Sequence, residues 1–276
     1  TYQITKFLNL NKQYKNIFFV LCSLIFLSII DYNIISVDHF SSREIPVLIL
    51  LIILINFFQN NQTNKFVIFI FGFLSICSLL WGIDRGLVIN LVIFNLALFF
   101  LFRKNYKFLG ILLGGIISWW LLFYFILGIE FKYFLENTIS IYKYMSYIHG
   151  IIHPTPFSDH PDSSRATKTL ISLVLICILT INLFFKKDKN FPNSFKYSAS
   201  FLALIAVLSY IYVVGRSDGP HIKHIFGYPI IFFSIYISYL FLIRLNEKIS
   251  LQKNNLVNFF LIILMIGYFI NNNKLN

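Results

Sequence analysis

Long uninterrupted runs of apolar residues alternate along the chain with short polar segments. Nine runs are read as membrane-crossing helices, because a helix needs about 20 mostly apolar residues to span a bilayer. They cover residues 17–35, 46–58, 66–82, 87–102, 108–129, 169–185, 197–214, 228–243 and 257–270. The second and ninth are short, and either could extend into its polar flanks or enter and leave the bilayer on one side. Because the runs do not alternate apolar and polar residues, as barrel strands do, the pattern predicts an all-α, polytopic transmembrane helical bundle of about nine spans.

Composition excludes a soluble globular protein. Of the 276 residues, 58% are hydrophobic and 12% are charged, about half of the charged fraction usual in soluble domains. The three cysteines, Cys22, Cys77 and Cys177, lie inside apolar runs and have no disulfide or metal spacing. We expect one domain over residues 1–276, and because Thr1 is not an initiator methionine, a segment upstream of it could be missing.

The charges of the loops predict the orientation of the bundle. With nine spans, the N-terminus and the even-numbered loops share one side, which carries 14 Lys and Arg against only Asp188 and Glu247. The opposite side carries nine basic and nine acidic residues. The positive-inside rule then places the N-terminus in the cytoplasm, and a bacterial inner (plasma) membrane is expected. The net charge of +12 is explained by topology, and no nucleic-acid partner is needed.

The outer side also carries every histidine of the chain. The six are His39, His149, His153, His160, His221 and His224. The positive-inside rule acts on Lys and Arg only, so it does not explain the placement of imidazoles. We therefore expect the functional face to be extracytoplasmic.

The longest outer loop covers residues 130–168 and has two different halves. The first half spaces apolar residues at near-helical intervals, interrupted by Lys132, Glu136 and Lys143, and it contains four tyrosines. This predicts an interfacial helix lying on the membrane surface. The alternative is a tenth span, which would invert everything downstream. The three charged residues argue against it, since each costs about 2.5–3.5 kcal/mol near mid-bilayer.

The second half of this loop, HPTPFSDHPDSSRATK, contains three prolines that forbid a regular helix. Asp159, His160 and Asp162 lie close enough in sequence to chelate a divalent cation or to supply a general base. Ser163 or Ser164 can cap the span that follows. The alternative is a proline-stiffened connector without chemistry.

The densest polar motif is G-R-S-D-G-P-H over residues 215–221, followed by Lys223 and His224. Its glycines permit a tight turn with exposed backbone amides. Arg216 can bind a phosphate in a bidentate fork, and Asp218 and the histidines can exchange protons near neutral pH. The alternative is a helix-capping turn in which Arg216 reaches the lipid headgroups.

A shorter outer turn carries the tripeptide Asp84-Arg85-Gly86, which can bind a ligand or simply pair and cap the helix ends. The first outer loop adds four polar residues without diagnostic spacing: Asp38, His39, Arg43 and Glu44. Within the runs themselves, no acidic or basic residue falls at mid-depth, which counts against an ion-coupled transporter.

Together these motifs resemble two families of the cell envelope. One is the GT-C-type integral membrane glycosyltransferases, which use polyprenyl-phosphate sugars, and the other is the O-antigen polymerase and ligase group. The resemblance is carried by G-R-S-D-G-P-H, by D-R-G at 84–86 and by the long Tyr- and Pro-rich loop, and it covers the whole chain as architecture. GT-C enzymes place a catalytic acidic motif in the first outer loop, where this chain has Asp38 and Glu44 but no adjacent acidic pair. The ligase group uses Arg and His in a late outer loop, which Arg216 and His221 match.

The resemblance implies sugar transfer at the outer face from a polyprenyl-linked donor in cell-envelope glycan assembly. The implied substrate-binding residues are Arg216, Lys223, His224, Asp84 and Arg85, and the implied catalytic residues are Asp218, His221, Asp159 and Asp162. The partners expected are membrane lipid and the lipid-linked donor, and a divalent cation is the one cofactor that the carboxylates suggest. The alternative is a non-enzymatic subunit that binds lipid headgroups or serves transport through the same loops.

Overall fold

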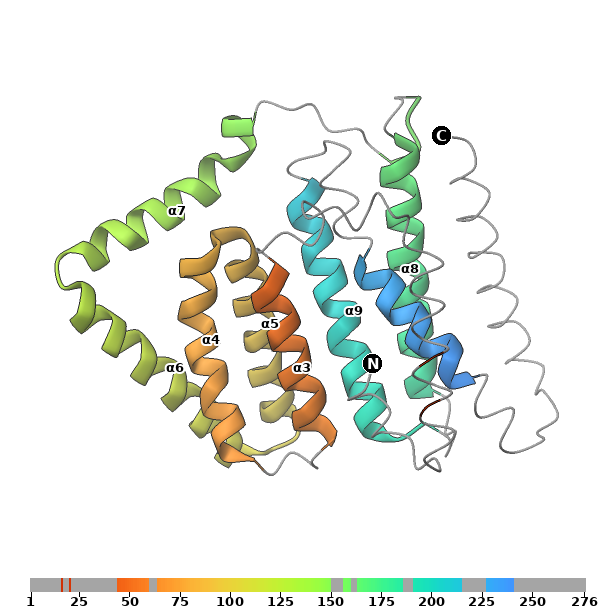
Figure 1. Cartoon of the computed structure of the whole chain (residues 1–276), viewed down its shortest axis with the longest axis horizontal. Helices are drawn as coiled ribbons and strands as arrows, with labels where there is room; N and C mark the ends of the chain where they lie inside the picture. The colour runs from red at the N-terminus through yellow and green to blue at the C-terminus, as the bar shows by residue number, and fades with distance from the viewer. Residues whose placement is uncertain are drawn as a thin grey trace.

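The computed structural model describes the chain over residues 44–59, 64–149, 156–159, 163–185, 191–214 and 227–240, and at residues 16 and 20. Every regular element in these ranges is a helix, which confirms the all-α prediction for the described part (Figure 1). The helices are α3 (Ile45–Gln59), α4 (Lys65–Trp81), α5 (Ile83–Phe102), α6 (Tyr106–Leu127), α7 (Glu130–His149), α8 (Ser163–Phe185), α9 (Asn193–Val214) and a last helix, Gly227–Leu240.

Seven of the nine predicted spans coincide with described helices. The other two, 17–35 and 257–270, fall outside the described residues apart from residue 20. Three helices are long and apolar enough to cross a membrane: Ile83–Phe102, Tyr106–Leu127 and Ala166–Phe185. Helices α3, α4 and Gly227–Leu240 are apolar but shorter. By length and composition, the described helices therefore support three membrane spans, and the count of nine is not supported.

Apart from α7, successive helices run up and down the bundle, which therefore has two ends (Figure 1). Helices α3, α5, α8 and Gly227–Leu240 begin at the end that we call the Glu44 end. Helices α4, α6 and α9 begin at the opposite end, which we call the Arg103 end. This up-and-down path brings segments that are distant in sequence to the same end of the molecule.

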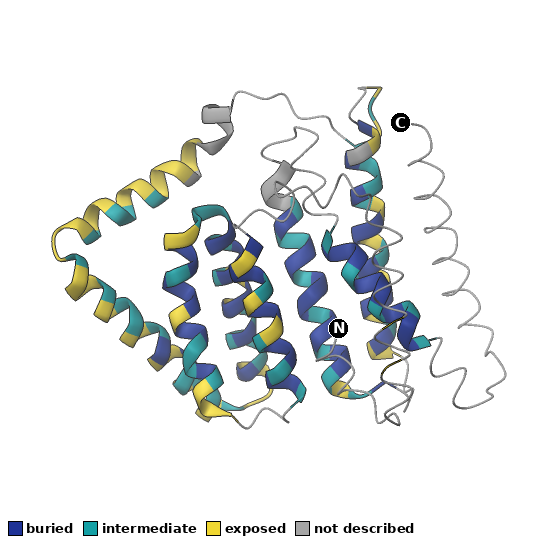
Figure 2. Cartoon of the chain, in the orientation of Figure 1, coloured by how far each residue is buried: buried dark blue, intermediate teal, exposed yellow. Residues whose placement is uncertain are grey.

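Aromatic side chains fill the core near the Arg103 end. The cluster consists of Phe57 and Phe58 of α3, Phe71 of α4, Phe99 and Phe100 of α5, Phe108 of α6, and Tyr197 and Phe201 of α9. Many of these rings meet edge to face, with centroids 5.1–6.4 Å apart, the geometry that aromatic quadrupoles favour. The Arg103 guanidinium lies over the rings of Phe99 and Tyr197, at 5.7 and 5.1 Å from their centroids. The cluster fastens α9 to α3 and α5, and Figure 2 shows these helices as largely buried.

Helices α4, α5 and α6 approach one another at glycines. A Cβ atom on Gly72 of α4 would lie 2.3 Å from the carbonyl carbon of Gly115 in α6, so only glycine allows this crossing. A Cβ on Gly86 of α5 would lie 2.6 Å from the Cα of Leu79 in α4. Small residues at such contacts let membrane helices pack backbone against backbone.

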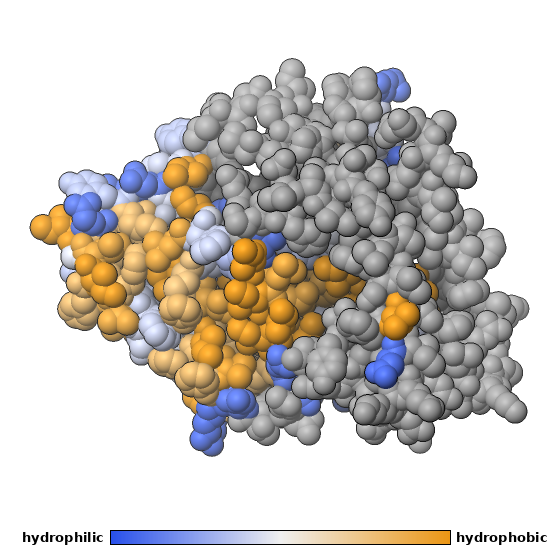
Figure 3. Space-filling view, in the orientation of Figure 1, coloured by the Kyte–Doolittle hydropathy of each residue, from blue (hydrophilic) through white to orange (hydrophobic). Residues whose placement is uncertain are grey.

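Helices α6 and α7 form a V whose apex points away from the rest of the bundle (Figure 1). The turn between them needs Gly128, whose φ of 55° is in the left-handed region. Phe131 and Phe134 of α7 pack against Phe123 of α6, with ring centroids 6.2 and 5.5 Å apart. The outward side of α6 is apolar and exposed, and Figure 3 shows apolar surface gathered over this part of the molecule.

The predicted helix in the first half of the long outer loop is present as α7. Its half-buried side includes Phe131 and Leu135, as the apolar spacing predicted, whereas Ile141 is exposed. Lys132 and Glu136 form an exposed ion pair at 3.7 Å, one turn apart. That α7 lies on a membrane surface stays a prediction.

The second half of that loop is shorter than predicted, because α8 begins at Ser163. Residues 163–168 therefore belong to the helix. The backbone N–H of Ser158 donates to the Ser163 hydroxyl at 2.9 Å, and the N–H of Phe157 donates to the Thr167 hydroxyl at 2.8 Å. These bonds attach the turn at 156–159 to the first turn of α8.

Candidate functional site

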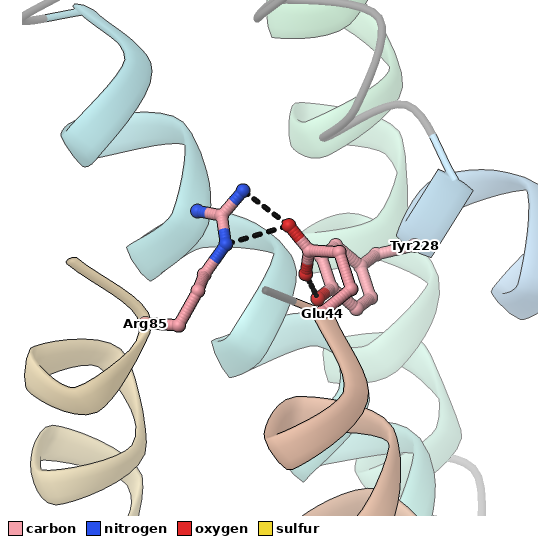
Figure 4. Close-up of polar contacts among 3 residues, drawn as sticks. All are labelled: Glu44, Arg85 and Tyr228. Carbon is pink, nitrogen blue, oxygen red and sulfur yellow. Dashed lines mark hydrogen bonds and ion pairs between the residues drawn. The ribbon is translucent and has the colours of Figure 1, made fainter. Parts of the chain in front are cut away.

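A buried ionic cluster lies at the Glu44 end and joins three parts of the chain. The Arg85 Nε atom donates to Glu44 Oε1 at 2.6 Å, and a terminal guanidinium nitrogen pairs with the same oxygen (Figure 4). The Tyr228 hydroxyl donates to Glu44 Oε2. The exposed fractions are 4% for Glu44, 5% for Arg85 and 4% for Tyr228. We call these three residues the Glu44 cluster.

Local sequence explains why each member lies at a helix start. Glu44 directly precedes α3, whose second residue is Pro46, and proline favours the first turn of a helix. Gly82 separates α4 from α5, so Arg85 falls in the first turn of α5. Tyr228 is the second residue of the helix Gly227–Leu240. All three side chains therefore come from the first turns of helices or from the residue just before one.

The geometry indicates that Glu44 fixes the positions of Arg85 and Tyr228. Both of its carboxylate oxygens already accept hydrogen bonds, one from Arg85 and the other from Tyr228. Charge-assisted bonds of this kind are stronger than neutral ones and fix the orientation of the groups that make them. Arg85 and the start of the last helix are thus held relative to α3 by one side chain.

A second polar network lies one turn further along α5 and fixes α5 against α4 and α6. The Asn90 amide donates to the backbone carbonyls of Gly86, at 2.8 Å, and Ser75, at 2.9 Å. The Ser75 hydroxyl donates to Asn90 Oδ1 at 2.5 Å, and the Trp120 indole N–H donates to that hydroxyl at 3.0 Å. Because Gly86 follows Arg85 directly, this network also sets the position of Arg85.

Replacing Asn90 with leucine is expected to lower the free energy of unfolding by about 1–2 kcal/mol, because two hydrogen bonds between α4 and α5 are lost. Asn95→Leu is the matched control. Its amide bonds to the Leu91 carbonyl of its own helix, and the side chain is half-buried. Thermal unfolding of the purified protein in detergent measures both variants. An equal loss in the two would contradict a special role for the Asn90 network.

Three of the residues implied by the resemblance lie in the described part of the chain. Arg85 is in the Glu44 cluster, Asp84 is half-exposed beside it in the first turn of α5, and Asp159 is exposed in the turn attached to α8. The other six lie outside the described residues: Asp162, Arg216, Asp218, His221, Lys223 and His224. Their roles, and the divalent cation suggested for the long loop, stay predictions. Within the described residues, no three His, Cys, Asp or Glu side chains are grouped so that they could hold a metal ion.

Sequence reasoning found Arg85 and Glu44 separately but not their contact. One alternative was that Asp84 and Arg85 pair with each other, whereas Arg85 forms its ion pair with Glu44, 41 residues away in sequence. Tyr228 was missed. A buried phenol needs a hydrogen-bond partner, but the pattern of the last apolar run does not indicate which of its aromatic residues is buried.

The two ends of the bundle differ in charge. Over the described ranges, the Arg103 end carries basic residues and no acidic one: Lys65, Arg103, Lys104, Lys107 and Lys196. Glu44, Asp84 and Asp159 are all at the Glu44 end. Arg85 and Lys168 are also at the Glu44 end, so over the described ranges that end carries charges of both signs, whereas the Arg103 end carries basic residues alone.

Comparison of the chain with protein-family models, with curated proteins and with solved structures found no match.

Proposed function

We propose that the protein is an integral membrane glycosyltransferase that acts at the extracytoplasmic face on a polyprenyl-linked sugar in cell-envelope glycan assembly. The observation that carries the proposal is the Glu44 cluster. It joins the flanks of the first, second and fourth predicted outer loops, which are the loops that carry Glu44, Arg85 and the G-R-S-D-G-P-H motif. A buried guanidinium at the start of a helix is suited to bind a phosphate.

The proposed topology is the nine-span bundle with its N-terminus in the cytoplasm of a bacterial inner membrane. Support comes from the up-and-down course of the helices and from the basic residues gathered at the Arg103 end. On the positive-inside rule the Arg103 end faces the cytoplasm and the Glu44 end faces outward. The shorter helices α3, α4 and Gly227–Leu240 contribute side chains to the same buried core.

In the proposed reaction, the hydroxyl oxygen of an acceptor attacks the anomeric carbon of the sugar. The bond from that carbon to the phosphate oxygen breaks, and polyprenyl phosphate leaves. Arg216, with Lys223 and His224, offsets charge on the phosphate, and Arg85 with Asp84 completes the binding site. Asp218 or His221 accepts the proton of the acceptor hydroxyl. Asp159 or Asp162 orients the acceptor or a divalent cation.

The test is transfer by the purified chain reconstituted in vesicles that contain an undecaprenyl-linked sugar. Arg216→Ala is expected to lower transfer about a hundredfold or more, because the developing phosphate charge loses its counter-charge. Lys143→Ala on the exposed side of α7 serves as control and should leave transfer unchanged. Insertion and folding are checked by protease protection and size-exclusion chromatography. Full activity in a folded Arg216→Ala variant would remove Arg216 from the mechanism.

A second candidate function is a non-enzymatic subunit that binds lipid headgroups. Both carboxylate oxygens of Glu44 already accept hydrogen bonds, which favours this function. The described cluster therefore has a cation that could bind phosphate but no carboxylate free to act as a general base. Asp218→Asn separates the two candidates. An enzyme should lose turnover, whereas a binding subunit should retain its affinity for the lipid.

A further inference from the structure

We propose that Glu44 is an internal counter-anion of Arg85, and that the phosphate of the lipid-linked substrate displaces it. This inference rests on the proposed function, because it takes Arg85 as a phosphate-binding residue. The ligand chemistry is a phosphate ester carried on a membrane lipid. The described structure is then the resting state, in which the carboxylate occupies the position that the phosphate takes.

The position of Arg85 is favourable for binding a phosphate. Its guanidinium is 5% exposed and lies in the first turn of α5, where the helix dipole repels a cation and attracts an anion. A cation at this position therefore needs an anionic partner at all times. Guanidinium groups bind phosphate oxygens through the same planar fork that they use for carboxylates, so phosphate and Glu44 compete for one set of donors.

Glu44 keeps one hydrogen-bond partner when it leaves Arg85. Its Oε2 atom accepts from Tyr228, whereas its Oε1 atom accepts from Arg85 (Figure 4). Glu44 also directly precedes α3, where free backbone N–H groups and the positive end of the dipole stabilise a carboxylate. Tyr228 and the start of α3 thus retain the carboxylate while Arg85 binds the phosphate. Among the described residues, Asp84, half-exposed in the same turn of α5, is a second acidic residue close to Arg85.

Exchange of this kind predicts opposite effects for two conservative variants. Glu44→Gln keeps the shape of the side chain but removes the competing charge, so the affinity for lipid phosphate should rise about tenfold if Glu44 occupies Arg85 about 90% of the time. Tyr228→Phe removes the group that holds the displaced carboxylate, so the affinity should fall. A purely structural cluster would weaken binding in both variants, because both loosen the same contacts.

The experiment measures binding of undecaprenyl phosphate to the full-length chain by native mass spectrometry in detergent. We expect tighter binding by Glu44→Gln, weaker binding by Tyr228→Phe, and loss of the gain in the double variant Glu44→Gln/Arg85→Gln. Glu44→Asp, which keeps the charge but retracts it by one methylene, should also bind more tightly and serves if the glutamine variant does not fold. Unchanged or weaker binding by folded Glu44 variants would overturn the exchange.

Two further measurements, phosphate competition and sugar transfer, identify the source of the phosphate and separate this inference from the proposed function. Inorganic phosphate is expected to compete only weakly with the lipid, and equal competition would overturn the assignment to a lipid. Sugar transfer that persists while the Glu44 variants bind no more tightly refutes the exchange and leaves the glycosyltransferase standing. Tighter lipid binding by Glu44→Gln, in a chain that transfers no sugar, supports the exchange and refutes the enzyme.

Discussion

Arg85→Ala is expected to lower the free energy of unfolding by about 3–5 kcal/mol, because it leaves the buried carboxylate of Glu44 without its cation. The loss should exceed that of Asn90→Leu, because the Asn90 network is neutral and breaking it leaves no buried charge without a counter-charge. Thermal or SDS-induced unfolding of the purified protein, followed by circular dichroism, gives the measurement. The double variant Glu44→Gln/Arg85→Gln should regain much of the lost stability, because no unpaired charge stays buried.

The exposed ion pair on α7 is the matched control for this prediction. Lys132 and Glu136 are 3.7 Å apart, with side chains 77% and 57% exposed. Lys132→Ala should change stability by no more than about 0.5 kcal/mol, because solvent screens the pair. If Arg85→Ala and Lys132→Ala had similar small effects, the Glu44 cluster would not be the strong ionic contact described above.

Gly72→Ala is expected to cost about 3 kcal/mol and to separate α4 from α6. The added Cβ would lie 2.3 Å from the carbonyl carbon of Gly115 and 2.6 Å from its oxygen. Backbone atoms cannot turn aside as a flexible side chain can, so the helices themselves must move apart. Size-exclusion chromatography and the midpoint of thermal unfolding report the change.

Gly114→Ala is the control, one residue from the contact that Gly72 makes. A Cβ on Gly114 would meet nothing within 4 Å. Alanine is a better helix former than glycine by about 1 kcal/mol, so this variant should be neutral or slightly stabilised. Destabilisation by Gly114→Ala comparable to that of Gly72→Ala would show that the crossing of α4 and α6 lies elsewhere.

The helical fold could be predicted from the sequence because each apolar run specifies its own element. A run of uniformly apolar residues cannot leave backbone groups unpaired in a membrane, and a helix satisfies them within the run. Run boundaries were less certain where polar residues continue a helix. The apolar run predicts a span only from residue 169, whereas the helix begins at Ser163, one of the two serines expected to cap it. The number of true spans could not be fixed, since helices such as α3 and α4 are apolar yet shorter than a bilayer crossing.

The candidate site could be predicted only in part, because its contacts join residues far apart in sequence. The order of the predicted spans puts Glu44 and Arg85 in loops on the same side, and the structure has both at one end of the bundle. Their ion pair depends on how α3 packs beside α5, which the aromatic cluster at the opposite end determines. No spacing rule connects residues 44, 85 and 228. The close contacts of glycines could not be predicted either. Gly72 and Gly115 look no different in sequence from Gly110 and Gly114, where an added Cβ would have no atom within 4 Å.

The V formed by α6 and α7 sets the depth at which the molecule would sit in lipid. Helix α6 has 22 residues, so it is about 33 Å long, close to the thickness of the hydrocarbon layer. Arg103 and Lys104 precede it, and the charged residues of α7 begin at Glu130, two residues after Gly128. For a bilayer that α6 crosses, these two points would mark the planes between hydrocarbon and headgroups. The length of α6 then sets the hydrophobic match, and a bilayer much thinner or thicker than this length would have to deform around the helix or tilt it.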